Sequence, residues 1–68
     1  MRIYKDHLIL SGSKVKQALL LLNELSQDAI LFVVDSDDKL IGAITDGDVR
    51  RGLIKGFTVD NYIDEIIQ

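Results

Sequence analysis

The sequence contains no cysteine and a single histidine, His7. Without cysteine the chain can form neither a disulfide nor a thiolate metal site, and one histidine excludes a metal site built from several histidines. Proline is also absent, which is unusual for a complete domain that is followed by a linker. Since the last residues continue an apolar helical pattern without a stop signal, we expect the chain to be a fragment of a longer protein.

Long apolar runs and clustered positive charge are missing as well. The longest apolar runs have six residues or fewer, whereas a helix needs about 20 apolar residues to cross a membrane. Residues 1–6 lack the apolar core of a signal peptide. The net charge is −3, and the eight Lys and Arg residues form no stripe with aromatic side chains between them, which argues against nucleic acid as the main partner. These absences point to the cytoplasm, with neither a membrane nor a nucleic acid as partner.

What the sequence does contain is more apolar residues than one small core needs. A chain of 68 residues has room for one small domain. Such a core contributes only about 3–5 kcal/mol without a disulfide, a metal or a partner. Because 47% of the residues are hydrophobic, we expect the domain to associate, either as a homodimer or by docking on the rest of a longer protein.

The hydrophobic pattern predicts a small α/β (α+β) domain with one small mixed sheet. Ser11 and Ser13 are candidate N-caps for the first helix, and Gly56 is suited to end the second. Residues 29–34 are so apolar that we expect a strand buried on both faces. The predicted elements, after an N-terminal arm over residues 1–7 and an extended segment to residue 10, are a helix over 14–25, strands over 29–34 and 40–45, a helix over 46–55 and a last helix capped by Thr58.

An apolar strand stops and a helix begins within residues 42–48. Thr45, with Asp48 three residues later, fits a capping box that uses Asp in place of Glu. The same corner brings backbone N–H groups and short polar side chains to a helix N-terminus, where anions bind. Spacing alone leaves both interpretations open. Asp46 and Asp48 also form an Asp-x-Asp pair, but no base, nucleophile or further metal ligand accompanies it, so we predict a domain without catalysis.

The segments around this corner resemble a CBS domain, the module named after cystathionine β-synthase. The resemblance rests on an ordered set of motifs, Val33-Val34-Asp35, Leu40-Ile41-Gly42 and Thr45-x-x-Asp48, and covers nearly the whole chain from about residue 8. It implies a β-α-β-β-α unit that works in pairs, with clefts for adenine nucleotides between the two copies. The partner would be a second CBS repeat or a second copy of this chain, and the ligand would be AMP, ADP or ATP rather than a catalytic cofactor.

The resemblance also assigns roles to individual residues. Thr45 matches the residue whose hydroxyl faces phosphate, and Asp48 matches the carboxylate that holds the ribose hydroxyls. These roles are chemically reasonable for the two residues. A carboxylate can accept hydrogen bonds from two vicinal hydroxyls, and a hydroxyl beside helix N–H groups can bind a phosphate. The other positions carried over are Ile30 and Leu31 for the base pocket, and Ser11 and Ser13 for a further phosphate or wall contact.

Two neighbours of these residues bear on the ligand. Gly47 has no side chain and permits close approach of a ligand to the backbone. Asp46 departs from the pattern, because a second carboxylate in the corner repels a phosphate unless Arg50, Arg51 or a metal compensates for it.

Residues 45–51, Thr-Asp-Gly-Asp-Val-Arg-Arg, are similar to CBS domains of two sugar-phosphate enzymes, the bacterial sugar-nucleotide nucleotidyltransferases and the arabinose-5-phosphate isomerases. The start at Met1 favours the first, in which the CBS pair is N-terminal. The resemblance thus implies a regulatory and dimerisation module that senses a nucleotide for an attached nucleotidyltransferase. The alternative is a purely structural dimerisation domain with a vestigial cleft, in which Thr45 and Asp48 only cap a helix.

Overall fold

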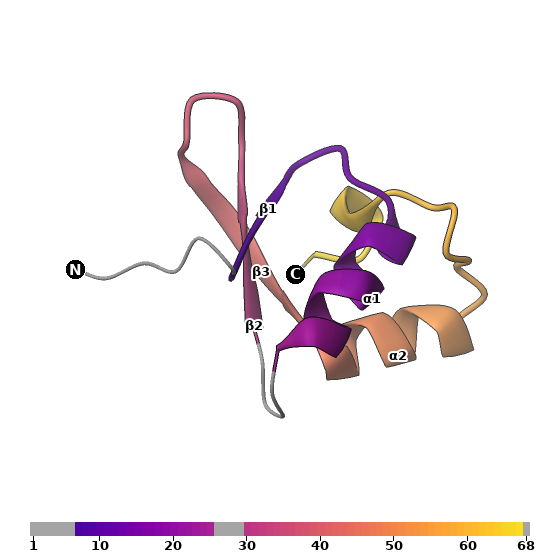
Figure 1. The fold of residues 1–68 in the computed structure, drawn as a ribbon. Coiled ribbons are helices and arrows are strands. Elements are labelled where there is room, and N and C mark those ends of the chain that lie inside the picture. The colour runs from indigo at the N-terminus through magenta and orange to yellow at the C-terminus, as the bar shows by residue number, and fades with distance from the viewer. Residues whose placement is uncertain (1–6, 26–29, 68) are drawn as a thin grey trace.

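The computed structural model describes residues 7–25 and 30–67. The predicted arm over residues 1–7, His7 apart, and the expected strand start at residue 29 lie outside the described residues. In chain order the elements are β1 (Leu8–Leu10), α1 (Val15–Glu24), β2 (Ile30–Val34), β3 (Leu40–Thr45), α2 (Asp46–Ile54) and the 3-10 helix η2 (Ile63–Glu65), arranged as in Figure 1. The predicted small α+β unit with a mixed sheet is confirmed.

The sheet has the strand order β1-β2-β3, with β1 parallel and β3 antiparallel to β2. Both long helices lie on the same side of it (Figure 1). Side chains alternate between the two faces of a strand, so one row enters the core beneath the helices and the other row stays outside. The buried row consists of Ile9, Leu31, Val33 and Ile44.

The opposite row forms an apolar surface that no described helix covers, here called the outer sheet face: Leu8, Leu10, Ile30, Phe32 and Ala43. Leu8 and Leu10 are 39% and 54% exposed, and the other three side chains are half-buried. The expectation that β2 is buried on both faces is met in this row only at Val34, which is 9% exposed; Ile30 and Phe32 are half-buried, because both helices pack on the other side of the sheet.

Helix α1 begins without a serine cap. Its N-cap is Lys14, whose N–H donates to Gln17 Oε1 at 2.9 Å. The interpretation of Ser11 or Ser13 as the N-cap is wrong, because the donors that a serine side chain would satisfy are taken by a distant segment of the backbone.

That segment is residues 57–67, here called the strap, which follows α2 and returns across the start of α1 (Figure 1). The N–H groups of Val15 and Lys16 donate to the carbonyl oxygens of Asn61 and Val59 at 2.8 and 2.9 Å. The first N–H groups of a helix have no partner inside the helix. The strap supplies the acceptors, so the start of α1 is closed by tertiary structure.

The strap also completes the core. Ile63 and Ile66 are 0% and 7% exposed. A last helix was predicted here, but only the short 3-10 helix η2 forms, because the N–H of Ile63 donates to Ser13 O at 2.8 Å and ties the strap to the loop before α1.

Helix α2 ends as the sequence predicts, at Gly56. This glycine has φ +110°, and its N–H donates to Leu53 O at 3.1 Å, while the N–H of Phe57 donates to Gly52 O at 3.0 Å. These two bonds form a Schellman motif, which needs a left-handed residue and therefore favours glycine. Among the described residues, no helix has the length and apolar character needed to cross a membrane.

Candidate functional site

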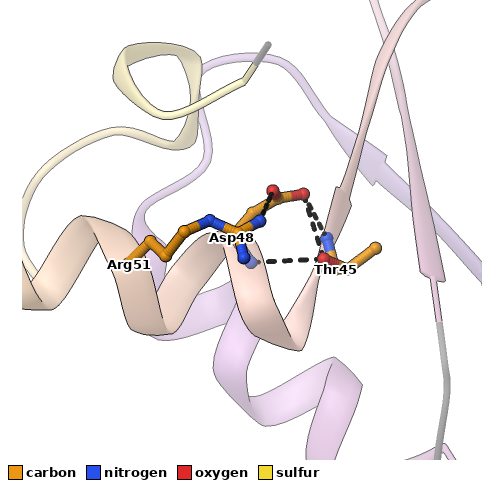
Figure 2. A network of polar contacts seen from close by, with 3 residues as sticks. All are labelled: Thr45, Asp48 and Arg51. Atoms are coloured by element: carbon orange, nitrogen blue, oxygen red, sulfur yellow. Dashed lines mark hydrogen bonds and ion pairs between the residues drawn. The ribbon is translucent and has the colours of Figure 1, made fainter.

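The candidate site is built on the corner where β3 passes into α2. Thr45 ends the strand and is the N-cap of the helix, in an extended conformation. Its hydroxyl oxygen accepts from the N–H of Asp48 at 3.2 Å, and Asp48 Oδ2 accepts from the N–H of Thr45 at 2.9 Å and from its hydroxyl at 3.1 Å (Figure 2). The predicted capping box is therefore present in full.

Asp48 has a second partner on the next turn of α2. Arg51 Nη2 donates to Asp48 Oδ1 at 2.6 Å, so both carboxylate oxygens are engaged (Figure 2). Partial burial by itself raises the pKa of Asp48, but the hydrogen bonds from the Thr45 N–H, from Arg51 and from the Thr45 hydroxyl outweigh it and hold this pKa below its usual value. Asp48 is thus kept ionised, which leaves both of its oxygens as hydrogen-bond acceptors.

Asp46, the residue expected to repel a phosphate, is paired as well. Arg50 Nη2 lies 2.5 Å from Asp46 Oδ2, and both side chains are largely exposed. Each acid of the first turn of α2 therefore has its own arginine. Arg50 and Arg51 therefore offset the charges of the two carboxylates at this corner.

Two more of the predicted residues lie at the corner. Ile30 is the register partner of Thr45, so the start of β2 runs beside it. Gly47 lies in the first turn of α2, where a Cβ would come within 3.3 Å of Arg51 Nη1. Leu31 is placed differently: it pairs with Ile44, is 0% exposed and faces the core.

Ser11 and Ser13 lie at the other end of the sheet. The N–H of Ser11 donates to Val34 O at 2.8 Å, at the end of β2 opposite Ile30. Within one chain these serines therefore do not converge with Thr45 on one ligand.

At that far end, the Ser11 hydroxyl and the Gly12 N–H both donate to the carboxylate of Asp64 in the strap, the latter at 2.7 Å. These two hydrogen bonds, the first above all, hold the pKa of Asp64 below its usual value. No local pattern in the sequence singles out Asp64, because its partners lie more than fifty residues earlier in the chain.

A hollow of about 80 Å³ adjoins Asp48, between α2 and the strap. It combines the carboxylate of Asp48 with two cations, Arg51 and Lys55, and with the aromatic ring of Phe57. Its full lining is Asp48, Arg51, Gly52, Lys55, Phe57, Glu65, Ile66 and Ile67. Only Asp48 among these was a predicted site residue, since the strap side of the hollow cannot be located before the fold is known. Among residues 7–25 and 30–67, no three His, Cys, Asp or Glu side chains gather as metal ligands.

Comparison with known proteins identifies a family and a curated relative. The family model of the CBS domain matches residues 7–55. A protein of Helicobacter pylori (strain J99), named only as uncharacterized, is 34% identical over 56 residues; the match covers 82% of this chain and 17% of that protein. The chain therefore spans about a sixth of the curated relative that it matches.

Two solved structures share the fold. One is the cystathionine beta-synthase pair domain of a protein named as an Mg2+ transporter from Shewanella oneidensis, with a TM-score of 0.71 and 19% identity over 90% of this chain and 34% of that chain. The other is a conserved protein of Pyrococcus horikoshii, named as uncharacterized, with a TM-score of 0.77 and 25% identity over 97% of this chain and 51% of that chain. In both cases the matched protein has room for more than one unit of this size.

Proposed function

The chain belongs to the CBS domain family, and on that premise we propose that it binds an adenine nucleotide at Thr45 and Asp48 and works paired with a second CBS repeat or a second copy of itself. CBS domains are generally regulatory, ligand-binding modules without catalysis of their own, and that coarser role comes with the family. The observation that carries the finer proposal is the corner of β3 and α2, where an ionised carboxylate, a hydroxyl and two arginines meet at a helix N-terminus.

At this corner a nucleotide can replace hydrogen-bond partners that the protein now supplies. Asp48 Oδ1 is held by an exposed side chain, Arg51, that is 64% accessible to solvent. Ribose hydroxyls can replace the guanidinium on this oxygen, and the released guanidinium can pair with a phosphate. The N–H groups of Asp46 and Gly47 point out of the first turn of α2, where an anion is favoured.

The outer sheet face supports the proposal of pairing. Its five side chains are apolar, and within the described residues no helix covers them. The Shewanella structure is described as a pair domain, and this chain covers 34% of it. If two sheets face each other about a two-fold axis, the Ser11 end of one copy can approach the Thr45 end of the other, which would bring the predicted phosphate contacts of the two ends together.

The attached enzyme is a further part of the proposal. The run of residues 45–51 is similar to CBS domains of sugar-nucleotide nucleotidyltransferases, so we propose such an enzyme, in the cytoplasm, as the one that this module regulates. Sequencing of the full-length gene product tests this directly: a nucleotidyltransferase domain beyond the CBS repeats supports it, and a sugar-phosphate isomerase domain or a transporter overturns it.

One observation favours the second candidate, a structural dimerisation domain with a vestigial cleft. Both oxygens of Asp48 are already satisfied inside the chain, by Thr45 and by Arg51. A complete capping box of this kind explains both residues without any ligand.

A thermal titration separates the two candidates. AMP, ADP, ATP and UDP-glucose are each added while the melting temperature is followed, for the wild type, Asp48→Ala and the control Asp60→Ala, which removes a carboxylate from the strap. A ligand at 100 times its Kd stabilises by about 2.7 kcal/mol. Shifts in the wild type and Asp60→Ala that disappear in Asp48→Ala support nucleotide binding. No shift with any nucleotide, together with a loss of about 1 kcal/mol in Asp48→Ala, supports the structural alternative.

Light scattering on the same samples tests the pairing. A particle of twice the chain mass supports association through the outer sheet face, and Phe32→Asp on that face should return it to a monomer. A monomer in the wild type at high concentration contradicts self-association and leaves the second CBS repeat as the partner to test in the full-length protein.

A further inference from the structure

The hollow beside Asp48 is too small for the ligand proposed above. It measures about 80 Å³, whereas pockets for drug-sized ligands measure about 300–1,000 Å³. A nucleotide that is to be enclosed on this side of Asp48 therefore requires one wall of the hollow to move.

The wall formed by α2 is fixed. Val49, on the same helix, is 1% exposed in the core, and the helix is closed at both ends by its capping box and by its Schellman motif. Moving this wall would disrupt the core of the domain.

The opposite wall is the end of the strap, residues 65–67, and it is held differently. The N–H groups of Glu65, Ile66 and Ile67 donate only to carbonyl oxygens of Tyr62 and Ile63, inside the strap itself. The Glu65 carboxylate likewise accepts only from Asn61 and Tyr62. Among the described residues, the strap end therefore has no hydrogen bond to the sheet or to either long helix.

Among the described residues, only side-chain packing holds this wall against the sheet and α2. Ile67 is its weaker contact with the core, because its side chain is only half-buried. The Ile67 side chain rests on the bare backbone of Gly42 in β3, so closely that a Cβ on Gly42 would overlap it. Ile67 is half-buried, whereas Ile66 is buried in the core. Just before this end, the strap is anchored by the bonds of Ile63 to Ser13 and of Asp64 to Ser11 and Gly12.

We propose that Ile67 is a movable wall of the Asp48 site, so that a ligand engaging Asp48 displaces Ile67 from Gly42 while Ile66 stays in the core and the anchor at Ile63 and Asp64 holds. The proposal rests on the proposed function, since it supplies the ligand. The conformation of the strap end then differs between the free and the ligand-bound domain, so ligand binding changes the surface of the domain beside the site.

Solution NMR of the full chain with AMP as the probe tests this. In the free chain, nuclear Overhauser effects join the Ile67 methyl groups to the Gly42 α-protons. With AMP, these effects should disappear, the Gly47 and Asp48 amides should shift, and the Ile63 amide should stay protected from hydrogen exchange. Ile67→Ala should bind AMP at least about threefold more tightly than the wild type, because no side chain has to be displaced. Val59→Ala, another apolar truncation on the strap, should bind as the wild type does.

The outcomes separate this inference from the proposed function. If AMP shifts the Gly47 and Asp48 amides while the Ile67 to Gly42 effects persist, the movable wall is overturned and nucleotide binding stands. If AMP binds Ile67→Ala but not the wild type, the result supports the movable wall, because the Ile67 side chain then keeps AMP out of the site in the wild type. If AMP binds neither chain, the proposed function fails and the inference fails with it. If Ile67→Ala does not fold, Ile67→Val is used in its place. The wild-type spectra alone still show whether Ile67 leaves Gly42 when AMP binds.

Discussion

Helices α1 and α2 both start with N–H groups that need acceptors, and they find them in opposite ways. At α1 the acceptors are the carbonyl oxygens of Val59 and Asn61, which come from the far end of the chain. At α2 the acceptor is the hydroxyl of Thr45, the residue immediately before the helix. One start is closed by tertiary structure and the other by its own sequence.

The difference decides where a ligand can bind. The backbone of the strap covers the start of α1, so a ligand there would have to break main-chain hydrogen bonds. The start of α2 is closed only by side chains, and the outermost of them, Arg51, is exposed. Side chains can exchange partners at small cost, which makes the locally capped helix the better candidate for a binding site.

The largest expected effect comes from removing the strap from the core. Ile63→Ala deletes a side chain that is 0% exposed, and such truncations cost about 2–5 kcal/mol, which is comparable with the whole stability of a domain this small. We expect Ile63→Ala to be largely unfolded in urea titrations followed by circular dichroism. Ile54→Ala, at a residue that is 79% exposed, should change stability by less than about 0.5 kcal/mol. Equal effects at the two sites would contradict the role of the strap.

A smaller effect separates the two kinds of cap. Thr45→Ala removes the side-chain acceptor at α2 and should cost about 1 kcal/mol. Ser13→Ala should cost less than about 0.5 kcal/mol, because Ser13 contributes its backbone carbonyl to Ile63 rather than a cap to α1. Melting temperatures of both variants measure this, and a larger loss in Ser13→Ala would reverse the comparison.

Acid should weaken two contacts through their carboxylates: the cap of α2 at Asp48, and the tie of Asp64 in the strap to the loop before α1. The folded-state pKa values of Asp48 and Asp64 lie below the usual value of about 4. The stability that these groups contribute is therefore present above about pH 4 and is lost as the pH falls through the folded values. Melting temperatures between pH 7 and pH 2 should fall less steeply in Asp48→Asn and Asp64→Asn than in the wild type. Asp60→Asn removes the same charge from the strap without these hydrogen bonds, and its curve should keep the wild-type shape.

The smallest effect concerns the two arginines. Arg50→Gln and Arg51→Gln each break an ion pair within α2, at largely exposed guanidinium groups, and should cost about 0.2–0.5 kcal/mol. We expect Arg51→Gln to cost more, because Asp48 is only 16% exposed whereas Asp46 is 60% exposed. The difference should shrink in about 1 M salt, where charges are screened within about 3 Å. A larger loss of stability in Arg50→Gln than in Arg51→Gln would contradict the expectation that the less exposed ion pair contributes more.

The parts of the fold that could be predicted are those fixed by neighbours in sequence. The period of apolar residues predicts α1, the apolar runs around an acidic turn predict β2 and β3, and Gly56 predicts the end of α2. The incomplete burial of β2 reflects the packing of both helices on one side of the sheet, and the failures at α1 and at the last helix involve the strap. The cap of α1 and the short length of η2 depend on hydrogen bonds between residues 13–16 and 59–63, which no local pattern encodes.

The candidate site divides in the same way. Thr45 and Asp48 were predicted because a separation of three residues places them together on one turn of a helix. Ion pairing of Arg51 with Asp48 follows from the same spacing. The residues on the strap side of the hollow are far in sequence from Asp48, as Asp64 is from Ser11. They become neighbours only in the folded chain, so no sequence pattern predicts these contacts.

The closure of α1 by the strap has a consequence for how the domain comes into being during synthesis. The family match ends at residue 55, yet the acceptors for α1 and two core isoleucines follow it. Long-range contacts of this kind form late, because the intervening chain must first be ordered. A nascent chain that has emerged only to the end of α2 would therefore hold the corner of Thr45 and Asp48 while α1 was still open at its start, and residues 57–67 would complete the domain once they emerged.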